Sequence, residues 1–462
     1  MQKFDLVILR TPRHAPVAAS IAASAALALA AAPAGADTAA PVHALLADPA
    51  QLAAWLRDHD PTSRASQAKV EQARELAHQA GVYQNPQLSA GVSDIALGLG
   101  NLPPPTPEAP MPMRGPISPL KTSNLSVGIS ELFEIGKRGP RRAAAELRTR
   151  EAIESSVENL GGRLSDATVA LGKIAYVVAV RDVARQNLEA ARQLEANERK
   201  RLEHKDLAGI DFARIELDTQ ELEVELTRAD ADIAVALTAC TATLFAGCNV
   251  EGLDVATLDT AAAVPAELAD ATRAVADRPS HQAQRLEASA LGQDAVLADH
   301  RKLPDPTIGL TYTYDNYNYS GSLPHSLAVS VGIPLPLLDR GNHDAAAARA
   351  SARSIELEED ATLRTELGAV EGLRKQFLAV RATLERYERE SLPRSQAIVE
   401  QARKAFDLGQ TGLAELLLDE RVHRDLVHKI LDTRFELFGV RTQLRRALGL
   451  DDVAARSAGG PR

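Results

Sequence analysis

"LSVGISELFEIGKRG", residues 125–139, and "LAVSVGIPLPLLDRG", residues 327–341, decide the fold of this chain. Each alternates apolar residues with small or polar ones and then reaches an arginine–glycine pair. They are preceded by "NPQLSAGVS" (85–93) and "DPTIGLTYT" (305–313), which also resemble each other. Each copy is followed by a long, charged stretch rich in Ala and Leu. A repeat on this scale predicts two copies of one structural unit.

The alternating stretches predict two β-hairpins. We expect a strand from residue 87 with a return strand over 124–134, and in the second copy strands over 307–316 and 325–333. The proline-rich segment 97–119 cannot be a helix or a central strand, and it is interpreted as an exposed hairpin tip.

The Ala- and Leu-rich stretches predict unusually long helices. After Pro140 no proline occurs up to residue 204, and at about 1.5 Å per residue a helix over 140–204 extends roughly 95 to 100 Å. A second helix is expected over 210–245, and the later copy repeats the pair over 342–408 and 413–448, interrupted only at Pro393. A shorter helix is expected over 61–84, with Asp60 as its N-cap. Gly209, Gly409 and Gly412 mark the helix-to-helix turns.

Composition restricts the class of protein. The chain has 462 residues, a formal net charge of −10 and only 3% aromatic residues. An acidic protein is a poor candidate for binding nucleic acid. Low aromatic and high alanine content favour closely packed, coiled-coil-like helices. Beyond the N-terminal region no stretch has the roughly 20 apolar residues of a spanning helix, so membrane contact would come through strands or a partner.

The N-terminus predicts export. Lys3, Arg10 and Arg13 precede an uncharged Ala-rich run, and Ala34, Gly35 and Ala36 form a small-residue cleavage motif before Asp37. A membrane-spanning helix is the weaker alternative because the run is short and Pro33 follows it. Cys240 and Cys248, the only cysteines, are expected to form a disulfide in an exported protein, with free thiols as the alternative.

These features divide the chain into five parts. Residues 1–36 are the predicted signal peptide, 37–248 the first repeat, 249–279 a linker of loop and short helices, 280–450 the second repeat, and 451–462 a flexible tail.

No catalytic set is found. His423 and His428 are five residues apart rather than three or four, so they are interpreted as solvated helix residues. There is no phosphate loop, nucleophile elbow or HExxH motif, and no metal site or cofactor is predicted. The chain is therefore not expected to be an enzyme, and a hydrolase with an unrecognised site is the weakest alternative.

The chain resembles the TolC-type outer-membrane factors, and more narrowly their cobalt-zinc-cadmium branch. The resemblance covers nearly everything after the signal. It rests on Asn85-Pro86, Asp305-Pro306 and the runs "SELFEIGKRGPRRAAAE" from Ser130, "VGIPLPLLDRGN" from Val331 and "AFDLGQTGLAELLLDE" from Ala405. The strand-to-helix passages that carry it include Gly136, Arg138, Gly139, Arg340 and Gly341.

This resemblance implies an α+β membrane protein. Its fold would be a homotrimer with a 12-stranded outer-membrane β-barrel, four strands per chain, continued by a long periplasmic α-helical barrel. The implied function is a passive exit duct for divalent heavy metals of the cobalt, zinc, cadmium and nickel type. Its partners would be a periplasmic membrane-fusion adaptor, an inner-membrane resistance-nodulation-division pump and outer-membrane lipid. A multidrug duct and, from another class, a soluble periplasmic coiled-coil scaffold are the alternatives.

Acidic residues at the helix turns are the candidate pore residues. The family's tip positions fall on Glu415 and on Leu418, with Asp419 beside the second, and Asp211 occupies the matching turn of the first copy. Lys205 and Arg214 are expected to pair across neighbouring helices there. Repeated carboxylates around a narrow pore would concentrate cations, whereas the alternative is a set of solvated turn residues.

Tyrosines distinguish the second hairpin from the first. Tyr312, Tyr314, Tyr317 and Tyr319 suit a membrane-interface girdle, and ordinary strand and loop tyrosines are the alternative.

Overall fold

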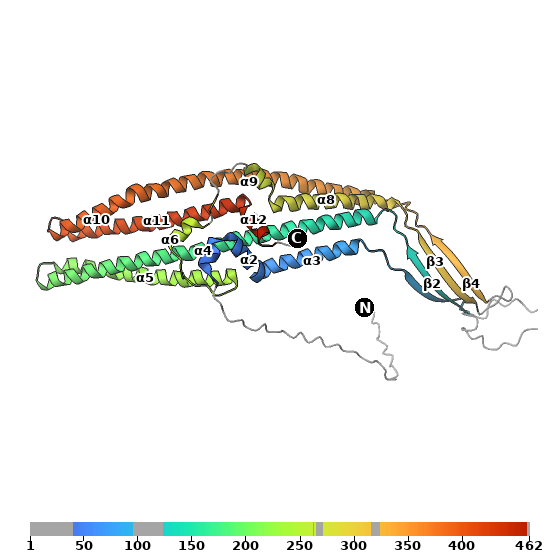
Figure 1. Ribbon diagram of the computed structural model, residues 1–462, viewed down its shortest axis with the longest axis horizontal. Helices are drawn as coiled ribbons and strands as arrows, with labels where there is room; N and C mark the ends of the chain where they lie inside the picture. The colour runs from blue at the N-terminus through green and yellow to red at the C-terminus, as the bar shows by residue number, and fades with distance from the viewer. Residues whose placement is uncertain (1–39, 96–122, 262, 265–270, 316–323, 460–462) are drawn as a thin grey trace, which may run out of the picture. The chain divides into compact units, whose positions relative to one another are not determined.

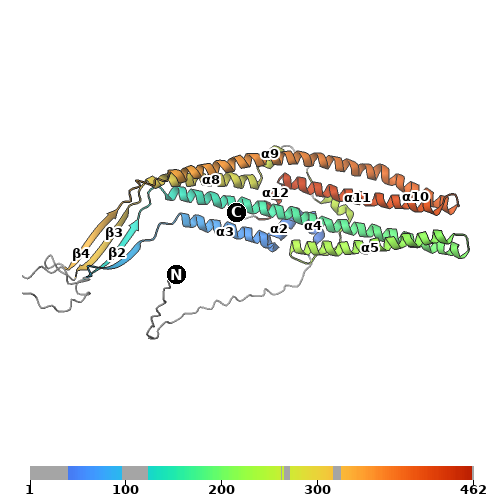
Figure 2. The same cartoon turned by 180° about the vertical axis from the view of Figure 1, so that it is seen from behind.

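The first copy contains one helix of exceptional length, α4 (Arg138–Glu203, 66 residues), and its partner α5 (Gly209–Leu244). The structure is a computed structural model that describes residues 40–95, 123–261, 263–264, 271–315 and 324–459. The two helices run side by side as a hairpin (Figures 1 and 2). The two long helices predicted for this copy are confirmed, with ends shifted by at most two residues. The predicted signal peptide, including Ala34, Ala36 and Asp37, lies outside the described residues.

The second copy repeats this hairpin with one irregularity. Its helices are α9 (Asn342–Arg386), the π-helical segment η3 (Tyr387–Ser391), α10 (Leu392–Asp407) and α11 (Leu413–Ala447). Pro393 lacks an N–H group and its ring excludes the carbonyl oxygen four residues earlier. The wider π turn immediately before it accommodates both effects, so the helix continues through the predicted interruption.

A shorter helix precedes the first strand of each copy. These helices are α3 (Pro61–Ala80) and α8 (Pro279–Asp299), the latter followed by the 3₁₀ turn η2 (His300–Lys302). Asp60 caps α3 as predicted, accepting hydrogen bonds from the Thr62 N–H at 3.0 Å and the Ser63 hydroxyl at 2.9 Å. The predicted helix over 61–84 is too long, because the chain leaves the helix at Gly81.

The four strands form one antiparallel sheet in the order β1–β2–β3–β4. They are β1 (Gln87–Ser93), β2 (Asn124–Leu132), β3 (Thr307–Asp315) and β4 (His325–Gly332). Strands from both copies therefore belong to the same sheet, because β2 pairs with β3 along its whole length. The predicted tip over 97–119 lies outside the described residues.

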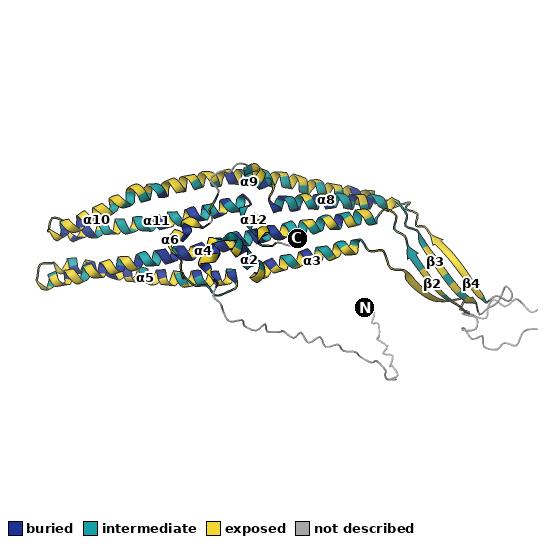
Figure 3. Ribbon diagram, in the orientation of Figure 1, coloured by how far each residue is buried: buried dark blue, intermediate teal, exposed yellow. Residues whose placement is uncertain are grey.

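The main hydrophobic core lies against the middle of α4. Leu164, Leu171 and Ile174 are fully buried there. They pack with three short helices, α1 (Val42–Ala47), α2 (Pro49–His59) and α6 (Val255–Thr260). Burial is concentrated in this region, whereas the sheet is largely exposed (Figure 3). Stability is thus supplied by the helices rather than by the sheet.

The linker between the copies contains two short helices, α6 and α7 (Ala271–Ala276), and short helices were predicted there. A disulfide joins Cys240 of α5 to Cys248 just beyond the helix end, so pairing rather than free thiols is observed. Cys248 also forms a parallel β-bridge with Ala40, which attaches the start of the described chain to the end of the first repeat.

The flexible tail predicted from residue 451 is wrong over most of its length. The chain forms α12 (Leu450–Ser457), in which Asp451 and Asp452 are buried. Gly449, with φ of 70°, turns the chain back so that these carboxylates face Arg445 and Arg446 in the last turn of α11. Burial raises the pKa of Asp452 to about 6, against the opposing attraction of Arg446. Only residues 460–462 lie outside the description.

Candidate functional site

The two faces of the sheet differ in chemistry. The strand register places one set of apolar residues on a common face: Leu88, Val92, Leu125, Val127, Ile129, Ile308, Leu310, Tyr312, Tyr314, Leu327, Val329 and Val331. All twelve are exposed, and Val329 is 73% accessible. The opposite face carries small and polar residues: Ser89, Gly91, Ser126, Gly128, Ser130, Gly309, Thr311, Thr313, Ser326, Ala328 and Ser330. Exposed apolar residues gathered on one face indicate a non-aqueous partner for that face.

The small residues of the polar face permit close packing between strands. A Cβ atom added at Gly128 would lie 2.8 Å from the Thr311 hydroxyl, and one at Gly309 would lie 2.6 Å from the Ser330 hydroxyl. The two outer strands, β1 and β4, each have one edge without a partner strand in the described chain. Such edges pair readily with another copy.

Tyr312 and Tyr314 stand together with His325 at one end of the sheet. The Tyr312 hydroxyl lies 2.6 Å from His325 Nδ1, and the Tyr314 ring centroid lies 5.3 Å from that of His325. Tyr317 and Tyr319 lie outside the described residues. The girdle remains a prediction.

Asp305 joins the two copies where strands become helices. Its carboxylate accepts the Ile135 N–H at 2.9 Å and pairs with Lys137 Nζ at 2.5 Å. Only some of the glycines and arginines that marked these passages have a structural reason to be there. Gly136 (φ 73°) and Gly341 (φ 75°) adopt the left-handed backbone conformation, which favours glycine. A Cβ atom at Gly341 would lie 2.1 Å from the Ala298 carbonyl oxygen. Gly139 lies in open space within α4, and Arg340 is exposed.

At each helix-to-helix turn, the helix that enters the turn is followed by a residue in the left-handed backbone conformation. In the second copy this residue is Gly409 (φ 69°), and Gln410 N–H donates to Ala405 O at 2.8 Å. In the first copy Lys205 (φ 64°) holds the same conformation, with Asp206 N–H donating to Arg201 O at 2.8 Å. Both patterns are Schellman motifs.

Gly209 and Gly412 are therefore not the residues that close the turns. Gly209 is the first residue of α5, and Gly412 is the extended N-cap of α11. Glycine was expected to hold the left-handed position at both turns, but in the first copy Lys205 holds it.

The three acidic candidates lie at or near the starts of the returning helices. Asp211 is in the first turn of α5 and Glu415 in the first turn of α11, where the helix dipole favours negative charge. Asp419 lies one turn after Glu415. Asp211 pairs at 3.0 Å with Arg214 of its own helix, so the expected pairing of Arg214 across neighbouring helices is wrong.

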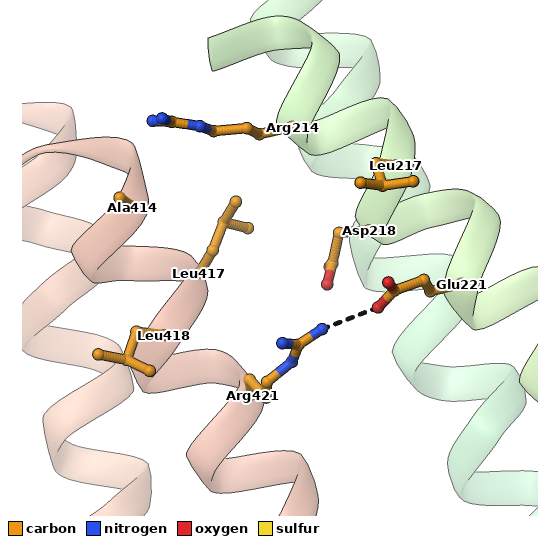
Figure 4. A pocket seen from close by; sticks show the side chains of 8 residues that line it. All are labelled: Arg214, Leu217, Asp218, Glu221, Ala414, Leu417, Leu418 and Arg421. Carbon is orange, nitrogen blue, oxygen red and sulfur yellow. Dashed lines mark hydrogen bonds and ion pairs between the residues drawn. The ribbon is translucent and has the colours of Figure 1, made fainter. Parts of the chain in front are cut away.

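A groove of about 290 Å³ separates α5 from α11 next to these turns (Figure 4). It is lined by Arg214, Leu217, Asp218, Glu221, Ala414, Leu417, Leu418 and Arg421. Leu418, at which the family pattern places an acid, is thus part of the groove wall, whereas the described side chains of Asp211, Glu415 and Asp419 do not line it.

An ionic ladder continues from this groove along α5 and α11. Arg421 pairs with Glu221 at 2.8 Å, and Arg424 holds Asp218 through two bonds of 2.8 and 3.2 Å. His428 Nε2 lies 2.8 Å from Glu225. The hydrogen bond raises the pKa of His428 and lowers the pKa of Glu225.

Sequence reasoning missed this ladder. His428 is partly buried against another helix, and His423 lies 3.0 Å from the Ser395 hydroxyl, so their interpretation as solvated residues is wrong. A signal was present, because the acids at 218, 221 and 225 and the bases at 421, 424 and 428 share the same spacing of three and then four. That spacing places each set on one helix face.

Two negative findings concern the described residues only. None of the described helices combines the length and apolar character needed to cross a bilayer. Within the described ranges, no three His, Cys, Asp or Glu side chains are grouped so that they could hold a metal ion.

The fold is that of known outer-membrane channels. The chain is similar to the CusC channel, with a TM-score of 0.72 and 14% identity over 87% of this chain and 91% of that one. It is also similar to the outer-membrane channel OprN (TM-score 0.69, 16% identity, 88% and 91% covered). For VceC of Vibrio cholerae the TM-score is 0.66, with 18% identity and 87% and 96% covered. No protein-family model and no curated protein sequence matches the chain. The chain therefore has the fold of the outer-membrane channel proteins, with long helices and a four-stranded sheet.

Proposed function

We propose that this chain is the outer-membrane channel subunit of a tripartite efflux system. It acts as a passive exit duct, located in the cell outer membrane and extending into the periplasm. The observation that carries this proposal is the two-faced sheet, which is largely apolar and exposed on one side and lined mainly with small and polar residues on the other. An apolar face suits lipid and a polar face suits a water-filled lumen.

The open edges of the sheet support assembly as a homotrimer. Four strands cannot close on themselves, and a bilayer tolerates no unpaired edge. In an antiparallel sheet of four strands β1 runs opposite to β4, so β4 of one copy can pair with β1 of the next in the same pattern. Three copies give twelve strands. The energy for export comes from an inner-membrane resistance-nodulation-division pump, reached through a periplasmic membrane-fusion adaptor.

Outer-membrane insertion is tested by fractionation of cells that produce the full chain. The protein is expected in outer membranes, released by detergent but not by high salt or alkaline washing. A freely soluble periplasmic protein would instead support the coiled-coil scaffold and contradict the proposal.

We further propose divalent heavy-metal cations of the cobalt, zinc, cadmium and nickel type as the cargo. The support is the resemblance of the strand-to-helix passages and the "DLGQTG" turn to the metal-exporting branch, and the acidic Glu415, Asp419 and Asp211 near the helix turns are proposed to attract cations. Deletion of the protein should lower tolerance to at least one of these metals. Unchanged metal tolerance together with new sensitivity to organic drugs would indicate a multidrug duct.

A further inference from the structure

A basic groove of about 530 Å³ lies between α3 and α4. Its lining residues come from the ends of these helices that lie next to the sheet (Figure 1). Four arginines and one histidine line it: Arg74, Arg138, Arg142, Arg150 and His78. Glu146 is the single acid in the lining, and its Oε1 atom forms an ion pair with Arg142 Nε at 2.8 Å. The groove therefore has an excess of positive charge.

The start of α4 increases this excess. Its first turn contains no acidic residue, and its first five residues include Arg138, Arg141 and Arg142. The positive end of a helix dipole favours anions, so cations there are unfavourable unless a negative group is nearby. Glu134 neutralises Arg141 through bonds of 2.6 and 2.9 Å, but Arg141 is not among the residues that line the groove.

Arg138 and Arg150 keep their charge available. Arg138 Nε donates to the Gly81 carbonyl oxygen at 2.7 Å, and its guanidinium lies 4.1 Å from the Tyr83 ring centroid. These contacts fix the orientation of the side chain without neutralising it. Among the described residues neither Arg138 nor Arg150 forms an ion pair. A held, planar guanidinium is suited to binding phosphate oxygens through two parallel hydrogen bonds.

Exposed apolar side chains connect the groove to the sheet. Val82 and Tyr83 follow α3, and Phe133 and Ile135 follow β2, and all four are exposed. A surface that passes from apolar strands through aromatic residues to arginines matches the order of acyl chain, interface and headgroup in a bilayer.

The groove opens on the side of α4 that faces away from the proposed duct. Arg142, Glu146 and Arg150 are spaced by four residues, and the same stripe continues to Val157 and Leu160, which line a small cavity with residues of α2 and α12. Three copies of α2 and α12 inside a duct would obstruct it. The stripe, and the groove on it, therefore face outward.

We propose that this groove binds the headgroup of an anionic phospholipid in the leaflet next to the helices. The inference rests on the proposed function for the position of the membrane, and it assigns a ligand class to residues that the duct itself does not use. Arg138 binds the phosphate, Arg150 adds positive charge to the same groove about 18 Å further along α4, and the apolar side chains of the passages contact the first part of the acyl chains.

Native mass spectrometry of the purified full chain tests the proposal. The protein is incubated with phosphatidylglycerol, with phosphatidylethanolamine of the same acyl chains, or with inorganic phosphate. The native protein should retain phosphatidylglycerol several-fold better than phosphatidylethanolamine. R138Q/R150Q should bring the two lipids to the same level, and R138K/R150K should restore part of the difference.

The control is R389Q/R394Q, which removes two exposed arginines of η3 and α10 far along the chain from the groove. It should leave the lipid preference unchanged. Because Arg138 also contacts Gly81, R150Q alone is measured as a variant that keeps this contact, and a smaller loss of preference is expected.

Three outcomes would overturn the proposal. The first is equal retention of both lipids by the native protein, and the second is a preference that survives R138Q/R150Q. The third is inorganic phosphate that displaces the lipid at matched concentration, which would make the ligand a free anion. Because this assay uses detergent-purified protein, its failure is distinct from failure of the fractionation experiment that tests the proposed function.

Discussion

Lys205 is a lysine in a backbone conformation that glycine adopts without strain. Its φ of 64° costs a side-chain-bearing residue about 1 kcal/mol relative to glycine. We therefore expect Lys205→Gly to raise the free energy of unfolding by up to about 1 kcal/mol. Thermal unfolding of the full chain in detergent measures this change. Lys200→Gly, within the last turns of α4, should lower stability by a similar amount, and a K205G variant no more stable than the native chain would contradict the argument.

Gly172 of α4 leaves room for the side chain of Phe438 of α11. A Cβ atom at this position would lie 2.2 Å from Phe438 Cε1, and Phe438 is fully buried. Gly172→Ala should therefore lower the free energy of unfolding by about 1–3 kcal/mol through overpacking. Gly292→Ala in α8, where nothing lies within 4 Å, should be neutral or stabilising. Partial rescue of G172A by Phe438→Leu would identify the contact as the cause.

The strands are the elements whose faces carry the proposed membrane contact. Val329 and Ala328 are neighbours on β4, and the register places them on opposite faces. Val329→Lys should reduce outer-membrane insertion, because a lysine facing lipid costs about 2–4 kcal/mol at the bilayer midplane. Ala328→Lys should insert normally. Equal yields of the two variants in outer membranes would contradict the assignment of the faces.

The α5–α11 ladder gives this helix pair a pH dependence. The raised pKa of His428 stabilises the pair fully below the ordinary value of 6.5, and this contribution is lost as pH rises through the folded-state pKa. The lowered pKa of Glu225 contributes above 4.5 and is lost as pH falls through its folded-state value. The two windows overlap between 4.5 and 6.5.

A double-mutant cycle of His428→Gln and Glu225→Gln measures this coupling. Both side chains are partly exposed, so we expect a coupling free energy below about 1 kcal/mol at pH 6 that approaches zero at pH 9. A coupling free energy of the same size at both pH values would show that the charge on His428 is not its source.

At the scale of the whole molecule, the duplicated order of strands and helices could be predicted from the sequence. Alternation and proline placement located the four strands and the long helices, because strand and helix periods are local properties. Contacts between distant elements were not readable in the same way. The predicted tail forms α12 because Asp451 and Asp452 pair with Arg445 and Arg446. His428 likewise pairs with Glu225 on another helix. Asp211 and Glu415 lie in the first turns of α5 and α11, but their relation to a lumen depends on other copies of the chain.

The number of copies is the prediction that belongs to this scale. Two copies would give eight strands, whose barrel interior is filled by side chains, whereas twelve strands leave an open lumen. Chemical cross-linking of the full chain in outer membranes should therefore produce dimers and trimers and no larger species. Cross-linked products that stop at two chains, or continue beyond three, would contradict the closed twelve-stranded arrangement.

The π-helical segment before Pro393 has a consequence for how the two copies relate. Asn342 to Asp407 contains the same number of residues as the 66 of α4, yet one of the two paths includes a wider turn. A π turn has the effect of one residue inserted into an α-helix, so the side chains beyond it are rotated by about 100° relative to an uninterrupted helix. Corresponding residues of the two hairpins thus point in different directions near their ends. A chain assembled from two identical first copies would keep the strand pairing and lose the correct orientation at the far end of its helices.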